Sequence, residues 1–143
     1  MNSKSNIDNT VEKAISATNA QMACRDLVNT PPNVATTTYI QQYIMNTFHD
    51  TTVKWERYDA QMLKELKMEG HLAVGRASVQ PTRVMKLTYT PNTYKKHKVF
   101  VGKGIIFDTG GYSLKPGDHM TTMQADKAGA MTVIGMMEYV AKY

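Results

Sequence analysis

The 143-residue chain carries a formal net charge of +5 and contains one cysteine, Cys24. A single cysteine excludes an intramolecular disulfide and fits a reducing compartment, so we expect a cytoplasmic protein. The chain has no run of about 18 apolar residues, which excludes a membrane-spanning helix, and its polar start is not typical of a signal peptide. The basic residues are dispersed, apart from the short run Lys95–Lys98, which argues against a nucleic-acid partner.

Residues 1–10 are polar, and we expect them to form a disordered linker ahead of a domain that occupies residues 11–143. From Val11, which Thr10 can cap, apolar residues recur at helical spacing until the Pro31-Pro32 pair ends the helix. Thr36–Thr38 then provide the cap of a second helix that continues to Phe48.

Three alternating or apolar segments predict β-strands: Thr51–Tyr58, Arg83–Thr90 and Val99–Phe107. Between the first two, Asp59 caps a short helix that runs to Lys67, and the small residues of Leu72–Ser78 predict a loop. A last helix follows Asp126 and continues to the end of the chain. This order predicts an α/β fold, with three layers (α/β/α) around a mixed central sheet that is incomplete.

The stretch from Lys103 to Asp126 is the strongest candidate for a functional site. Lys103 interrupts an apolar strand, where its charge is costly unless it is paired or removed. Asp108 follows at the carboxyl end of that strand, and the Gly110-Gly111 pair permits a sharp turn beside it. Because ligands of open α/β sheets bind outside the carboxyl ends of the strands, we expect the site at this edge.

Several motifs occur in a fixed order along the chain. They are Arg25–Asn33, Leu72–Ser78, Val101–Pro116 and Met120–Asp126. Together they resemble the leucine aminopeptidase family, which consists of cytosolic exopeptidases that use two metal ions. The resemblance covers nearly the whole chain from about Val11 onward. It implies that residues 11–143 are the amino-terminal portion of that family's catalytic domain.

The resemblance implies a role for individual residues. The family's metal-binding lysine matches Lys103, and its aspartate ligands in this region match Asp108 and Asp126. The lysine that acts on the substrate carbonyl matches Lys115, which makes it the candidate catalytic residue. Met123 matches a residue near the pocket for the substrate's first side chain, so the resemblance places all of these side chains at the substrate-binding site.

The residue types suit this chemistry. Asp108 and Asp126 supply hard oxygen ligands, and Lys103 binds a metal only as a neutral amine, a form that burial and nearby cations favour. A charged Lys115 can stabilise the oxyanion that develops when water adds to a peptide carbonyl. We therefore expect two divalent metal ions, Zn or Mn with Mg also open, that hold and acidify the attacking water.

The family completes its site with a downstream segment that carries two further carboxylate ligands and an arginine, and this segment is absent from the chain. Lys127 and Ala128 also occupy positions where many relatives have Met and Gly. We therefore predict part of a metal-dependent aminopeptidase that releases leucine-like residues from peptides, inactive as a single chain. The resemblance further implies a homo-oligomer, which is a hexamer in the intact family.

Two alternatives remain open. The chain could be a non-catalytic folding or assembly fragment of the same fold, without a functional metal site. A phosphate-binding loop is the weaker alternative, because the glycines around Lys103 match neither the P-loop pattern nor the dinucleotide-binding pattern.

Overall fold

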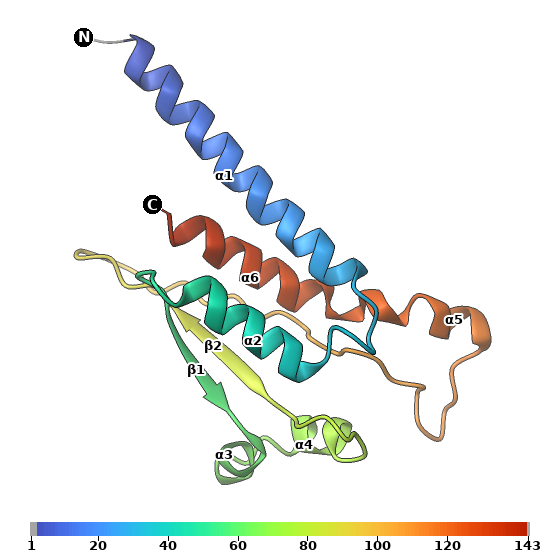
Figure 1. The fold of residues 1–143 in the computed structure, drawn as a ribbon. Helices are drawn as coiled ribbons and strands as arrows, with labels where there is room; N and C mark the ends of the chain where they lie inside the picture. The colour runs from blue at the N-terminus through green and yellow to red at the C-terminus, as the bar shows by residue number, and fades with distance from the viewer. Residues whose placement is uncertain (1–2, 143) are drawn as a thin grey trace.

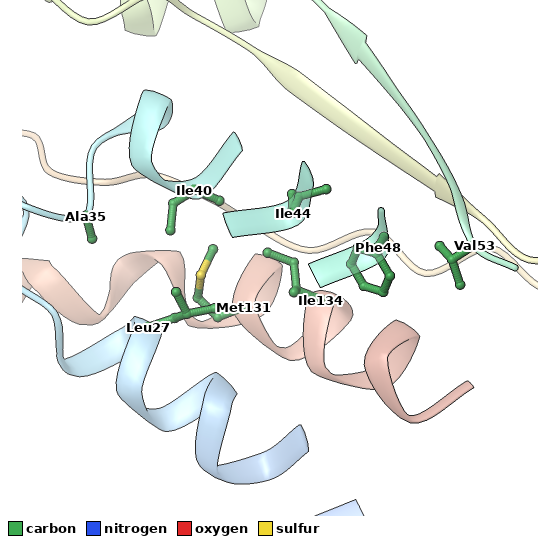
Figure 2. Packing of buried hydrophobic residues seen from close by; sticks show 8 residues of the cluster. All are labelled: Leu27, Ala35, Ile40, Ile44, Phe48, Val53, Met131 and Ile134. Atoms are coloured by element: carbon green, nitrogen blue, oxygen red, sulfur yellow. The ribbon is translucent and has the colours of Figure 1, made fainter. Parts of the chain in front are cut away.

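The computed structural model describes residues 3–142, which form helices packed on a small sheet (Figure 1). Two helices from opposite ends of the chain, α1 (Ser3–Asn29) and α6 (Ala128–Val140), lie side by side. Helix α2 (Thr37–Phe48) lies between α6 and the two strands, as both views show (Figures 1 and 2). Helices from the two ends of the described chain therefore pack together in one layer.

Helix α1 begins at Ser3, within the expected linker, so the expected helix start near Val11 is wrong. Residues 1–2 of that linker lie outside the described residues. No glycine or proline interrupts residues 3–29, and Ile7 extends the i, i+4 spacing of the helix toward its amino terminus. Thr10 lies inside the helix, where its hydroxyl donates to the Asn6 carbonyl at 2.9 Å instead of capping.

The first half of α1 extends beyond the end of α6 (Figure 1). Its apolar residues Ile7, Val11 and Ile15 are exposed, and burial along the helix starts at Ser16 and Ala20. The buried residues of α1 therefore lie in its second half.

The core lies between α1, α2 and α6 (Figure 2). The Thr36 hydroxyl caps α2 as expected, because it accepts a hydrogen bond from the Tyr39 amide at 3.2 Å. Apolar residues one turn apart on α2 then face inward onto α6. The buried cluster consists of Leu27, Ala35, Ile40, Ile44, Phe48, Val53, Met131 and Ile134.

Strands β1 (Lys54–Tyr58) and β2 (Val84–Thr88) form an antiparallel pair in which Lys54 lies opposite Thr88. Both lie within strands that the alternating pattern predicts. Trp55 and Leu87 lie opposite each other and pack against the core, so Trp55 is a core residue, as we expect for a large apolar side chain. Asp59 caps α3 (Ala60–Glu65) through the amides of the first helical turn, again as predicted.

Two predicted elements are wrong. The expected loop Leu72–Ser78 is helical over most of its length, because α4 (Glu69–Gly75) continues to Gly75. The expected strand Val99–Phe107 is not a strand, because no neighbouring strand pairs with it in the described part of the chain. A strand requires a ladder of hydrogen bonds to a neighbour. Val99, Phe100, Val101 and Phe107 are exposed, whereas Ile106 is half-buried and packs against the core.

The fold is a partial α/β domain, so the predicted α/β class is confirmed. Within residues 3–142 the sheet has two antiparallel strands, and the parallel pair of the expected mixed sheet is not among them. The remaining helical segments, α5 (Gly117–Thr121) and η1 (Met123–Lys127), connect the glycine-rich loop to α6. None of the helices over this range is both long and apolar enough to cross a bilayer.

Candidate functional site

Close backbone packing brings Lys103 to the start of α6. The Ala130 amide donates a hydrogen bond to the Lys103 carbonyl at 2.8 Å. A Cβ atom at Gly102 would lie 2.4 Å from the Gly129 carbonyl oxygen, and one at Gly129 would lie 2.9 Å from the backbone nitrogen of Lys103. The two glycines therefore allow the extended segment to contact the amino-terminal turn of α6 directly.

This contact places Lys103 beside Asp126, which lies in η1 one residue before the buried Lys127. The Lys103 Nζ atom lies 2.7 Å from Asp126 Oδ2 and 2.9 Å from Asp126 Oδ1, so the ammonium bridges both carboxylate oxygens. The Lys103 side chain is 63% exposed and that of Asp126 is 29% exposed, which places the pair at the surface. Lys103 therefore pairs its charge instead of burying it.

The glycine-rich loop forms a second ion pair. Gly110 adopts a φ of 91°, and its amide donates to the Asp108 carboxylate at 2.8 Å. The Lys115 amide donates to the Thr109 carbonyl at 2.8 Å, which closes the loop and returns the Lys115 side chain to Asp108. The Lys115 ammonium then contacts the Asp108 carboxylate directly.

The two pairs belong to one electrostatic cluster. The Lys115 ammonium holds the pKa of the Asp108 carboxyl below its usual range, with smaller contributions from the Gly110 amide and from the charge of Lys103. Lys103 thus acts on Asp108 as well as on Asp126. The structure brings together four of the five residues that the sequence singles out, in an alternating arrangement of two ammonium groups and two carboxylates.

The cluster consists of carboxylates that are each paired with a cationic side chain. Each carboxylate is held by an ammonium, which stands in for a cation of single charge. The donors suit a hard divalent ion, because carboxylate oxygens are the ligands that such ions prefer. Among residues 3–142, no group of three or more His, Cys, Asp and Glu side chains gathers that could hold a metal.

Met123 and Lys127 lie on the inner side of the same turn. Met123 is 6% exposed and lies in η1, so it is buried while the charged groups lie at the surface. Lys127 is wholly buried, and burial lowers the pKa of its ammonium. The sequence shows Lys127 only as a departure from the family pattern, and its buried environment has no signal in the residues around it.

Comparisons with known proteins identify the family of this chain. Residues 22–143 match the model of the catalytic domain of the cytosol aminopeptidase family. The chain therefore belongs to the cytosol aminopeptidase family, which confirms the resemblance that the motifs indicate. It is 41% identical over 119 residues to a probable cytosol aminopeptidase from Helicobacter hepaticus, and 41% identical over 133 residues to one from Burkholderia lata.

Those alignments cover 82% and 92% of this chain, but 25% and 26% of the two relatives. Solved structures give the same picture. The leucyl aminopeptidase of Trypanosoma brucei in complex with actinonin is 30% identical, with a TM-score of 0.85 over 92% of this chain and 26% of that one. The bottromycin maturation enzyme BotP in complex with Mn is 33% identical, with a TM-score of 0.83 over 94% of this chain and 29% of that one. The chain thus spans about a quarter of the length of its relatives.

Proposed function

We propose that this chain supplies part of the active site of a metal-dependent aminopeptidase, which releases leucine-like residues from the amino terminus of peptides. The observation that carries the proposal is the cluster in which Lys103 pairs with Asp126 while Lys115 pairs with Asp108. Membership of an aminopeptidase family supports it, because the cluster lies within the part of the chain that matches the catalytic domain.

In this proposal Asp108, Asp126 and Lys103 hold divalent metal ions, with Zn and Mn as the first candidates and Mg open. The description of BotP in complex with Mn supports a metal, and the two carboxylates support a hard one. Bound ions of this kind acidify a water molecule and polarise the substrate carbonyl. Lys103 must lose its proton to act as a ligand, so the ion pair with Asp126 and metal binding exclude each other.

Lys115 is the proposed catalytic residue. Its ammonium would stabilise the oxyanion that develops on the peptide carbonyl, which requires that it turn from Asp108 toward the substrate. A cation bound to Asp108 would compete for the same carboxylate oxygens and so release Lys115. Met123 is proposed to border the pocket for the substrate's first side chain, and its small exposed fraction limits that contact to its tip.

The competing proposal is a non-catalytic folding or assembly fragment. The observation that favours it is that both carboxylates already have cationic partners within the chain, so the cluster is satisfied without a metal. Under the first proposal the single chain has little or no peptidase activity, because it offers part of a ligand set. The two proposals therefore differ in metal binding and not in the activity of the single chain.

Isothermal titration calorimetry with Mn²⁺ and Zn²⁺ distinguishes them. We expect the chain to bind metal and to lose binding in both Asp108→Asn and Asp126→Asn, which keep the side-chain shape but remove the charge. Asp118→Asn, an exposed residue on the neighbouring α5, is the matched control and should bind as the unaltered chain does. Absence of binding, or equal binding by all variants, would support the non-catalytic fragment.

For the whole protein we propose peptide substrates, a cytosolic location and assembly into a homo-oligomer. The names of the relatives support the first two of these. Size-exclusion chromatography with light scattering on the whole protein tests the third, and a single monomeric peak would contradict it.

A further inference from the structure

Lys127 has an unusual environment for a lysine. Its side chain is 0% exposed, and its ammonium donates to three backbone carbonyls: to Val28 at 3.1 Å, to Thr30 at 2.9 Å and to Gln124 at 2.7 Å. Within the described range, no carboxylate forms an ion pair with it. An ammonium has three donors, so all of its hydrogen-bonding capacity is used on neutral acceptors.

Two of these acceptors lie at the carboxyl end of α1. A helix leaves its last carbonyls without partners inside the helix, and its carboxyl end carries a partial negative charge. The Val28 carbonyl is such a group, and the Thr30 carbonyl belongs to the residue that directly follows the helix. Lys127 reaches them from 97 or more residues away in sequence. The same end of α1 therefore provides the acceptors and the electrostatic potential that allow an ammonium to be buried without a carboxylate.

The third acceptor, Gln124, belongs to η1, which is the turn that also contains Asp126. Lys127 points inward from this turn to α1, while the adjacent Asp126 points outward to Lys103. The ammonium thus fixes the turn at its own carbonyl and at the end of a packed helix. Whatever holds η1 in this position also sets the position of the Asp126 carboxylate.

We propose that Lys127 is a positioning residue for Asp126, and that it acts by tying η1 to the carboxyl end of α1. Its role at the metal site rests on the proposed function, but the tie itself does not. Lys127 thus has a structural role at a position where many members of the family, by resemblance, have a methionine. The Arg25–Asn33 motif takes part as well, because its Val28 and Thr30 carbonyls accept hydrogen bonds from the ammonium.

The test compares Lys127→Met with Leu63→Ala in the 143-residue chain. Methionine has a similar length but no donors, so it leaves three buried carbonyls without partners. Leu63 is fully buried in α3, away from η1, so Leu63→Ala provides a loss of stability without a change at the turn. Both variants are compared at a temperature at which circular dichroism shows them to be folded.

The first measurement is hydrogen exchange of the Ala130 amide, which reports the contact between α6 and the Lys103 carbonyl. After correction for global stability through the Leu63→Ala variant, we expect about tenfold faster exchange in Lys127→Met. The second measurement is the Mn²⁺ dissociation constant. It should rise about tenfold in Lys127→Met, because residues that orient metal ligands contribute to affinity on this scale. In Leu63→Ala it should stay within about twofold of the value for the unaltered chain.

Equal corrected exchange in the two variants would overturn the proposal, because Lys127 would then contribute only to overall stability. Faster exchange together with no Mn²⁺ binding by the unaltered chain would support the tie and contradict the proposed metal site. If Lys127→Met does not fold, Lys127→Arg takes its place. Arginine keeps the charge but cannot aim three donors from one atom, so we expect weaker Mn²⁺ binding and faster exchange of Ala130, and unchanged values would overturn the proposal.

Discussion

Gly102→Ala should destabilise the chain strongly for a substitution that adds one methyl group. The added Cβ atom would lie 2.4 Å from the Gly129 carbonyl oxygen and 2.6 Å from the Ala130 Cα atom, and both are backbone atoms that cannot rotate away. Overpacking of this kind costs about 1–3 kcal/mol. If the added methyl group moves the Gly102 segment away from α6, the hydrogen bond from the Ala130 amide to the Lys103 carbonyl is also lost, which adds about 1 kcal/mol.

The combined loss is about 2–4 kcal/mol, which for a chain of this length corresponds to a melting temperature lower by about 6–14 °C. Thermal unfolding followed by circular dichroism measures it. Gly117→Ala is the matched control, because a Cβ atom there meets nothing within 4 Å. The same variant should weaken Mn²⁺ binding, since Lys103 moves away from Asp126. Equal melting temperatures for the Gly102 and Gly117 variants would refute the reasoning that this segment packs directly on α6.

Three further predictions concern the loop, the helices and the sheet. Gly110→Ala should lower the free energy of unfolding more than Gly111→Ala in urea titrations, because both need a positive φ but only the former meets a carbonyl, at 2.3 Å. Burial raises the pKa of the Glu138 carboxyl above 4.5, so the folded chain binds this proton more tightly than the unfolded chain does. The free energy of unfolding should therefore fall as pH rises from 4.5 through the raised pKa, and Glu138→Gln should make this pH dependence smaller. The exposed Lys86–Glu56 pair across the strands should show a coupling in double-mutant cycles that disappears in high salt, and a salt-independent coupling would contradict this.

Local signals in the sequence predict the capped helices well. Thr36 and Asp59 accept hydrogen bonds from amides of the turns that follow them, as their residue types indicate. The two alternating segments become the paired strands, because their periodicity of two matches a surface that is buried on one face. These features depend on neighbours within a few residues, so the sequence contains what is needed to predict them.

Features that depend on distant partners are less predictable. Val99–Phe107 has the composition of a buried strand, but composition cannot supply a neighbour to pair with. Helix α1 extends to Ser3 because nothing breaks it, and the polarity of its first residues misleads. The polarity of these residues therefore does not mark where the helix begins.

The candidate site shows the same division. Spacing alone does not show that Lys103 meets Asp126, because the contact depends on the approach of Gly102 to Gly129. The family motif identifies these residues as candidates but does not give their positions relative to one another. The partners of Lys127 are backbone carbonyls, which have no identity in a sequence, so its contacts could be found only in the structure.

The exposed first half of α1 indicates which residues the folded core does not need. Burial along the helix starts at Ser16, and the match to the family begins at residue 22. Residues 6–15 are all exposed, and helical segments of this length with little packing are only marginally stable in water. A protease should therefore be able to trim them progressively while the core stays intact, which would yield a shorter and better-behaved domain for crystallisation.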